Sequence, residues 1–442
     1  MIAKHMFLKK KTLGLLLATA ALVVLLAGCN DTLRQFITPV PQPGGDPAAL
    51  SHAIVLSTNP NPGALGSDLH INVSGDSVVG VVSVGPNPVF LAKTSNRVYV
   101  LNGNNTVSTY IALNPLSSLV NTVTLPAGTL GVAAGGGSNG DVYVADGSTA
   151  ATPPAVTTVP MISGGVNAVT DQITVGSQPV AIVGNASNSK IYVLNFGGGN
   201  VTPVSTTDNF VLPNITVGTN PVWGVMAPDG GHAFIVNQGS GSVSVIDTLL
   251  DKVIATVPVG TTAAPSPNYA VFEPTLQRLY VSNTGENTIS VIKANGTDLA
   301  NGILPTKIAD VPVSGTPTSV AALPNGTRAY AALGSCPAGT NHTNIAARAT
   351  TCTGSTVSVI DAASLTEKKT IAVGAGAVSI DAANDSSRVY VVGAAAGNVS
   401  IIRPVSDTVV TTVPAPQQSF GCATPGACPA TPQIPFMVRV FP

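Results

Sequence analysis

Charged side chains are scarce in this chain. Its 19 Lys or Arg and 20 Asp or Glu make up only 9% of 442 residues, whereas a typical soluble domain carries about 25%. This scarcity excludes a charge-rich disordered protein, a long-helix protein and a basic protein that binds nucleic acid. Hydrophobic residues nevertheless reach 44%, which is enough for a sizeable core.

Long hydrophobic runs are also missing, except near the N-terminus. There, lysines at positions 4 and 9–11 precede an apolar run over residues 13–26. The run is too short for a comfortable transmembrane helix and ends in small residues, as a secretory signal does. The sequence L-A-G-C at 26–29 resembles the lipobox of bacterial lipoproteins. The resemblance implies a signal peptide over 1–28 and a diacylglycerol thioether on Cys29, which anchors a chain to a membrane without spanning it. The alternative is an ordinary signal peptide followed by a chance cysteine.

Removal of residues 1–28 makes the chain weakly acidic. Four of the 19 basic residues and no acidic residue are lost, which leaves 15 against 20 and a net charge of −5. This balance argues against a nucleic-acid partner. Residues 29–50 are rich in Pro and Gly, so we expect a flexible tether before a single domain over 51–442. Asn30 stands where Asp would be the familiar inner-membrane retention signal, so the resemblance favours the outer membrane, on its periplasmic or surface face, in a cell with two membranes.

Cysteines are few, but those that follow Cys29 are even in number. They are Cys336, Cys352, Cys422 and Cys428. Outside the cytoplasm such a set suggests two disulfides, and we favour Cys336–Cys352 and Cys422–Cys428 among three connectivities because each pair closes one loop. Metal binding is the alternative, and the missing C-x-x-C spacing weakens it.

A tandem repeat organises the rest of the chain. Its signature is an aromatic residue followed by Val, a variable residue and Asn or Asp. Starts of successive copies lie 44, 49, 42, 46, 50 and 60 residues apart, a period that indicates a propeller or a solenoid. The copies are Val98–Asn102, Val142–Asp146, Ile191–Asn195, Ala233–Asn237 and Leu279–Asn283, with degenerate copies at Ala329–Leu333 and Val389–Gly393.

The repeat unit is clearest over residues 219–260. Four short β-branched or aromatic runs alternate there with Gly, Pro, Asp and Ser turns. Four short antiparallel strands per unit make one blade of a β-propeller. The unit resembles the YVTN β-propeller repeat of secreted and surface-layer microbial proteins, most specifically at 234–237, 242–247 and 257–260, and again at 279–283 with 288–292. This resemblance covers roughly residues 51–442 and implies an all-β fold.

The strand count predicts eight blades. First-strand candidates occur near residues 88, 130, 179, 221, 269, 317, 377 and 434. Residues 51–85 contain three strands without a first one, and Ile434–Val440 is a first strand without a continuation. We therefore expect the two chain ends to share a split closing blade, which removes open edges. Seven blades is the alternative, with one terminal piece as an appendage.

Most conspicuous polar residues are explained by the repeat. We expect its tyrosines to pack between blades, its asparagines to cap turns, and the cationic residues two positions before each aromatic to be solvated. No H-E-x-x-H, G-x-S-x-G or G-x-x-x-x-G-K motif occurs, and no two histidines have metal-ligand spacing. We expect no catalytic residues, no metal and no cofactor.

Insertions mark the candidate binding face. In a propeller, second-to-third and fourth-to-first connections share one face, where segments 146–160, 260–268 and 334–355 would lie. Long loops often carry function. The last of these contains His342 and Arg348, which we take as candidate binding residues; a neutral surface insertion is the alternative.

The sequence therefore favours a lipid-anchored, non-catalytic propeller for binding or surface display. We expect a monomer whose partners are a membrane, through its anchor, and an unknown protein or carbohydrate, but no nucleic acid. One alternative is a hydrolase resembling propeller lactonases, which predicts Asp, Glu, His or Arg converging at the central channel. The other is a surface-layer structural component, which predicts ordered self-association.

Overall fold

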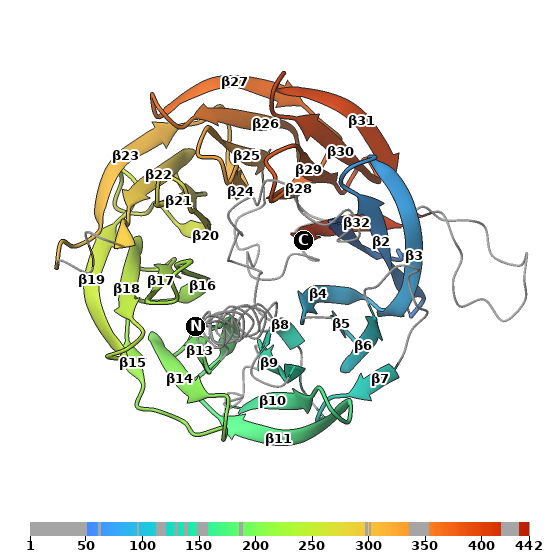
Figure 1. The fold of residues 1–442 in the computed structure, drawn as a ribbon, viewed down its shortest axis with the longest axis vertical. Coiled ribbons are helices and arrows are strands. Elements are labelled where there is room, and N and C mark those ends of the chain that lie inside the picture. The colour runs from blue at the N-terminus through green and yellow to red at the C-terminus, as the bar shows by residue number, and fades with distance from the viewer. Residues whose placement is uncertain are drawn as a thin grey trace, which may run out of the picture. The chain divides into compact units, whose positions relative to one another are not determined.

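The computed structural model describes residues 51–60, 63–94, 97–111, 121–127, 129, 131–136, 140–147, 158–184, 189–296, 299, 302–335, 353–416 and 433–441. These residues form eight four-stranded antiparallel sheets arranged as the blades of a ring (Figure 1). The fold is an all-β propeller, as the repeat predicted. No helix in the described part of the chain is long and apolar enough to cross a bilayer.

Each blade begins at the centre of the ring and ends at its rim. The first strands are β4 (Pro88–Lys93), β8 (Gly131–Gly136), β12 (Pro179–Gly184), β16 (Pro221–Met226), β20 (Pro267–Glu273), β24 (Pro317–Ala322), β28 (Ala377–Ala382) and β32 (Ile434–Phe441). The second strands are β5 (Arg97–Asn102), β9 (Val142–Asp146), β13 (Lys190–Asn195), β17 (His232–Asn237), β21 (Arg278–Asn283), β25 (Arg328–Ser335), β29 (Val389–Gly393) and β1 (His52–Thr58).

The outer halves of the blades are less uniform. The third strands are β6 (Thr106–Ile111), β10 (Thr158–Ser163), β14 (Asn200–Ser205), β18 (Ser242–Asp247), β22 (Thr288–Lys293), β26 (Thr353–Asp361), β30 (Asn398–Arg403) and β2 (Leu65–Asn72). The fourth strands are β7 (Asn121–Thr124), β11 (Ala168–Thr174), β15 (Ile215–Thr216), β19 (Lys252–Pro258), β23 (Thr306–Pro312), β27 (Thr366–Ala372), β31 (Thr408–Pro414) and β3 (Ser77–Pro86). β7 and β15 are short, so their blades cover less of the rim.

The closing blade joins the two chain ends. Its strand order is β3-β2-β1-β32, and β1 pairs with β32 in a register that sets Ala53 opposite Val440. The expectation of eight blades with a split closing blade is confirmed, and the seven-blade alternative is wrong. Closure pairs the edges of two terminal segments that would otherwise be open.

Repeat tyrosines and asparagines have the expected structural roles. Tyr192 and Tyr330 are fully buried between blades, as are their counterparts in the other copies. Asn237 ends β17, and its Nδ2 donates to the hydroxyls of Ser242 (3.2 Å) and Ser244 (3.0 Å) at the start of β18. The side chain therefore fastens the second-to-third connection, and Asn283 repeats this pattern in the next blade.

The cationic repeat position differs from expectation, because it is not simply solvated. Arg388 donates from Nε to both carboxylate oxygens of Asp76 (2.9 Å each), in the neighbouring closing blade. Lys190 pairs with Asp251 (2.7 Å) in the same way. Asp76 and Asp251 have positive φ values of 51° and 49°, in the third-to-fourth turn, so the left-handed turn aims each carboxylate at the preceding blade. These pairs link adjacent blades, and sequence spacing alone does not reveal them.

Candidate functional site

Side chains of the first strands join neighbouring blades at the centre of the ring (Figure 1). Each inner strand is the innermost strand of its sheet, so its free edge needs hydrogen-bond partners. Side chains of the preceding blade supply several of them. The indole N–H of Trp223 donates to the carbonyl of Ala270 (3.1 Å), and Asn268 donates to that of Thr318 (2.9 Å). In the next blades, the hydroxyl of Thr318 donates to the carbonyl of Ala377 (3.1 Å). The backbone N–H of Val438 donates to the hydroxyl oxygen of Ser379 (3.2 Å).

Arg439 lies on β32, the inner strand of the closing blade, and contacts Trp223 and Tyr269. We call these three residues the channel cluster. The guanidinium carbon of Arg439 lies 5.8 Å from the ring centres of both Trp223 and Tyr269, which stack on each other at 4.5 Å. The aromatic pair belongs to β16 and β20, and the β16 blade is four positions away from the closing blade in a ring of eight (Figure 1). Arg439 therefore reaches from one side of the ring toward the other.

One end of this guanidinium has no hydrogen-bond partner. Nη1 of Arg439 donates to the Val438 carbonyl (3.2 Å), but Nη2 has no acceptor although the residue is only 6% exposed. A buried donor without an acceptor costs about 1–3 kcal/mol, and more when charged. An acceptor placed at Nη2 would recover this cost.

Asp381 lies on β28, the inner strand of the blade that precedes the closing blade, and the charge of Arg439 acts on it. It accepts hydrogen bonds from the backbone N–H groups of Val440 (2.9 Å) and Ala382 (2.9 Å). Burial raises the pKa of Asp381, and the positive charge of Arg439 partly opposes that rise. Its Oδ2 accepts from Val440 and so helps to hold β32 in place, whereas its Oδ1 accepts from its own strand.

The arrangement favours recognition over catalysis. A guanidinium with free N–H groups binds carboxylates and phosphates, and stacked aromatic rings offer a flat apolar surface beside it. No nucleophile paired with a base stands beside this cluster among the described residues. Across the same residues, no group of three or more His, Cys, Asp or Glu side chains is placed to hold a metal ion.

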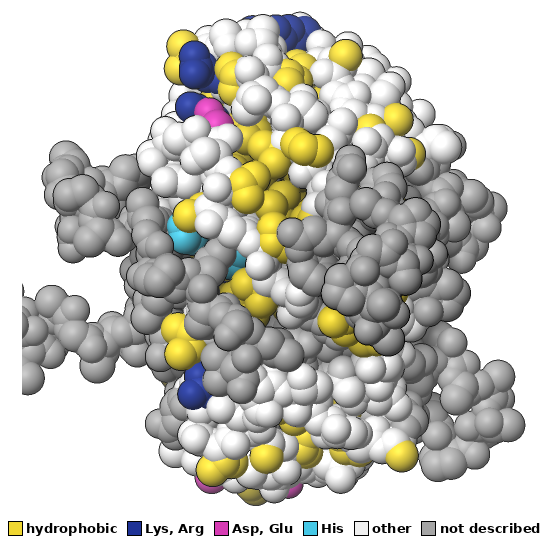
Figure 2. All heavy atoms as spheres, turned by 90° about the vertical axis from the view of Figure 1, so that its right-hand side faces the viewer, with side chains coloured by type: hydrophobic (Ala, Val, Ile, Leu, Met, Phe, Trp, Pro, Cys, Tyr) yellow, Lys and Arg dark blue, Asp and Glu magenta, His cyan; other side chains and the backbone are white. Residues whose placement is uncertain are grey.

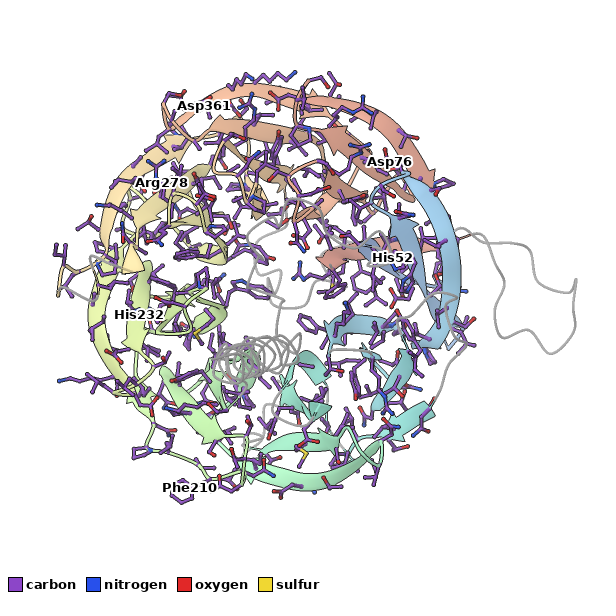
Figure 3. The ribbon with its side chains drawn as sticks, in the orientation of Figure 1. His52, Asp76, Phe210, His232, Arg278 and Asp361 are labelled. Atoms are coloured by element: carbon purple, nitrogen blue, oxygen red, sulfur yellow. The ribbon has the colours of Figure 1, made fainter. Side chains whose placement is uncertain are left out.

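A second polar cluster is buried between the closing blade and the next blade. Tyr110 on β6 donates its hydroxyl proton to Asp68 on β2, and Nε2 of His70 lies 2.8 Å from the same hydroxyl oxygen. His52, labelled in Figure 3, lies on β1 of the closing blade. Its ring meets that of His70 edge to face, with 5.8 Å between the ring centres. All three members of the chain Asp68–Tyr110–His70 are fully buried, so this cluster joins two blades and is closed to ligands.

Burial controls the protonation of this cluster. It raises the pKa of Asp68 to about 7, despite the opposing hydrogen bond from Tyr110. Burial, together with the charge effects of His52 and Lys93, lowers the pKa of His70 to about 3. The pKa of Tyr110 lies well above its ordinary value, chiefly because of burial. The cluster is therefore most stable with zero net charge.

Every residue that the sequence singled out as a functional site lies outside the described residues. These are the lipidation candidate Cys29, the disulfide candidates Cys336, Cys352, Cys422 and Cys428, and the binding candidates His342 and Arg348. The described ends of the last insertion, Ser335 and Thr353, pair with each other at the face where the first strands begin. A binding role for this segment stays a prediction.

The channel cluster escaped sequence reasoning for a physical reason. Trp223, Tyr269 and Arg439 come from three blades, and no spacing connects them. A signal was present, because register matches Trp223 and Tyr269 with Ser319 and Ser379 in later blades. Large aromatic residues where other copies carry a small residue mark a departure from the repeat.

A cavity of about 480 Å³ lies between the closing blade and the next one. Residues 81–86 of β3 line one side, and Thr106, Ser108 and Thr122 line the other. Figure 2 faces the side of the ring that carries β3 and shows hydrophobic side chains grouped near its middle.

Comparison with solved structures identifies relatives in fold. A protein of unknown function from Desulfotomaculum acetoxidans is 14% identical, with a TM-score of 0.54 over 82% of this chain and 95% of its own. Dihydro-heme d1 dehydrogenase, in complex with DHE, gives a TM-score of 0.63 at 11% identity, over 87% and 77%. A candidate 6-phosphogluconolactonase from Bacteroides fragilis gives 0.55 at 11% identity, over 91% and 100%.

These likenesses show the fold alone. No family model matches the chain, and no curated protein matches it in sequence. The neighbours therefore support a propeller and do not extend the YVTN resemblance beyond its motifs.

Proposed function

We propose that this chain is a lipid-anchored, extracytoplasmic propeller that works by binding a ligand rather than by catalysis. The observation that carries the binding role is Arg439, whose buried guanidinium has an unpartnered Nη2 beside two stacked aromatic rings. The geometry suits a small anion with a carboxylate or phosphate group and a flat or ring-shaped part. Sugar acids and aromatic carboxylates belong to this class.

Lipid anchoring is supported by the sequence. The basic residues, the short apolar run and L-A-G-C at 26–29 agree with a lipoprotein signal. Mass spectrometry of the membrane fraction tests it directly, since the mature chain should begin at Cys29 and carry acyl chains. A mature chain without acyl mass, or one that begins elsewhere, would reject the anchor.

Trp223 provides the test of the binding role, because it is the only tryptophan in the chain. Titration with a panel of sugar acids, aromatic carboxylates and sugar phosphates should change its emission for at least one compound. Arg439→Met should abolish that response. Arg403→Met, which alters an exposed arginine on β30, is the matched control and should leave it unchanged. A response that persists in Arg439→Met would reject this site.

A lactonase-like hydrolase is the second candidate. It is favoured by the position of Asp381 and Arg439 on adjacent first strands, because the lactonase alternative predicts convergent charged groups at the channel. A lactone panel tests it: turnover above the buffer rate that Asp381→Asn removes would support hydrolysis. Turnover at the buffer rate in the unaltered protein would reject it.

A further inference from the structure

Large apolar side chains project from one face of the ring. They occupy connections between third and fourth strands, where Leu249 is 88% exposed and Val405 is 92% exposed. Leu250 is exposed in the same turn as Leu249, and the same connection in other blades exposes Val166, Ile303 and Leu304. Because these connections are topologically equivalent, they lie on the same face, opposite the one where the first strands begin. Turn tips are usually polar, so apolar tips in four blades indicate an interaction surface.

Two carboxylates beside these tips are neutralised by ion pairs. Asp251, beside Leu250, is paired with Lys190, and Asp407, near Val405, is paired with Arg328 and Lys368. Asp251 and Asp407 are therefore engaged in links between blades, while Asp247 accepts from the backbone N–H groups of Leu249 and Leu250.

Exposed cations flank the same tips. Lys252 follows Leu250 by two residues, and Arg403 precedes Val405 by two; both cations are exposed. An apolar tip flanked by exposed cations is suited to the interface of a bilayer that contains anionic lipids.

The first described strand begins at this same face. β1 begins at His52, and Ser51 accepts a hydrogen bond at its carbonyl from the N–H of Val73 (3.0 Å), next to the third-to-fourth turn of the closing blade. The hydroxyl of Ser51 donates to the carbonyl of Phe441 (2.8 Å), at the end of the first strand. A chain that arrives from residues 29–50 thus enters on the side of the apolar tips.

We propose that this face is a lipid-contact surface that rests on the bilayer, with the apolar tips in the headgroup region. The proposal uses the lipid anchor of the proposed function, which would hold this face near the membrane. The tips would then fix the orientation that a flexible tether alone leaves free. The opposite face, where the first strands begin, would point away from the bilayer.

The test uses protein without an anchor, so that lipid contact is measured separately from lipidation. The chain from residue 29 onward with Cys29→Ser retains all described strands. It is mixed with vesicles of phosphatidylethanolamine and phosphatidylglycerol, and the bound fraction is measured by sedimentation. We expect binding, and we expect the combined variant Leu249→Ser, Leu250→Ser and Val405→Ser to weaken it by about tenfold or more.

Val410→Ser is the matched control, because it removes an exposed valine from the outer strand β31 in the same blade as Val405. It should bind as the parent does. Equal binding by the combined variant and the parent, or no vesicle binding by the parent, would overturn the lipid-contact face. These outcomes leave the acyl mass at Cys29 and the Trp223 response unaffected, so failure of this proposal differs from failure of the proposed function.

Discussion

At the residue scale, few polar groups depart from the repeat, and those that do are the informative ones. Arg439 has no repeat-defined partner, whereas Arg388 is satisfied by Asp76. The unpartnered Nη2 of Arg439 therefore supports the proposed ligand site, while the pair between Arg388 and Asp76 stabilises the fold.

The emission of Trp223 should respond to Arg439 even without a ligand. The indole is largely buried and packs against Tyr269 and the guanidinium. We expect an emission maximum typical of a buried indole, which shifts to longer wavelength in Arg439→Gly because water can then reach the ring. An unchanged spectrum in this variant would show that the guanidinium does not cover the indole. Arg403→Gly serves as the control.

The buried pair Asp68 and His70 should make opposite contributions to the pH dependence of stability. Asp68 has a raised pKa of about 7, so its native state holds a proton that the unfolded state has lost, and stability falls as pH rises from about 4 to 7. His70 has a lowered pKa of about 3, so stability rises with pH from about 3 to 6.5. Together the two effects largely cancel.

Asp68→Asn should remove this cancellation. Only the histidine contribution then remains, so the free energy of unfolding should rise with pH between about 4 and 6.5, more steeply than in the parent. Urea denaturation across this range measures the slopes. Parallel curves for parent and variant would contradict a protonated Asp68 beside a neutral His70.

At the element scale, the closing blade determines whether the ring holds together. β32 is the inner strand of that blade and pairs with β1, far away in sequence. A chain ending at residue 416 lacks this strand, so we expect a much lower melting temperature and an exposed β1 edge. A peptide of residues 433–442 should restore stability by adding the missing strand, whereas a scrambled peptide should not. Unchanged melting of the shortened chain would contradict closure by β32.

The pair between Arg388 and Asp76 fastens the same blade from the rim. Both side chains are mostly buried, and the single Nε–H of Arg388 is shared between the two carboxylate oxygens of Asp76. Arg388→Met should therefore lower the free energy of unfolding by about 1.5–3 kcal/mol, the range for hydrogen bonds to charged groups. Urea denaturation measures the change, with the exposed Arg403→Met as the control. Equal losses in both variants would show that the pair adds nothing specific.

At the scale of the whole molecule, sequence predicted the architecture because the repeat is local. Tyr192, Asn237 and their counterparts recur with the blade, and each performs the same packing or capping role. The split closing blade followed from counting strands.

Neither the channel cluster nor the buried cluster around His70 could be predicted from the sequence. Arg439 contacts Trp223 across the ring, and His70 of the closing blade contacts Tyr110 of the next blade. Such contacts depend on how many blades close and in which register, so no local pattern encodes them. The ion pairs between blades were missed for the same reason, since Arg388 and Asp76 are 312 residues apart.

Low charge also has a clearer meaning at this scale. Several of the scarce charges, such as Arg388, Lys190 and Asp251, are engaged between blades. The proposed contact with lipid therefore relies on apolar tips such as Leu249 more than on a charged patch.

The central claim is that the channel cluster binds a small anion through Arg439. Isothermal titration calorimetry with the anion that most changes the Trp223 emission tests it most directly, in the parent, Arg439→Lys and Arg439→Met. We predict weaker binding in Arg439→Lys, because an ammonium lacks the planar fork, and a loss of about tenfold or more in Arg439→Met. Equal affinity in all three proteins would contradict the claim.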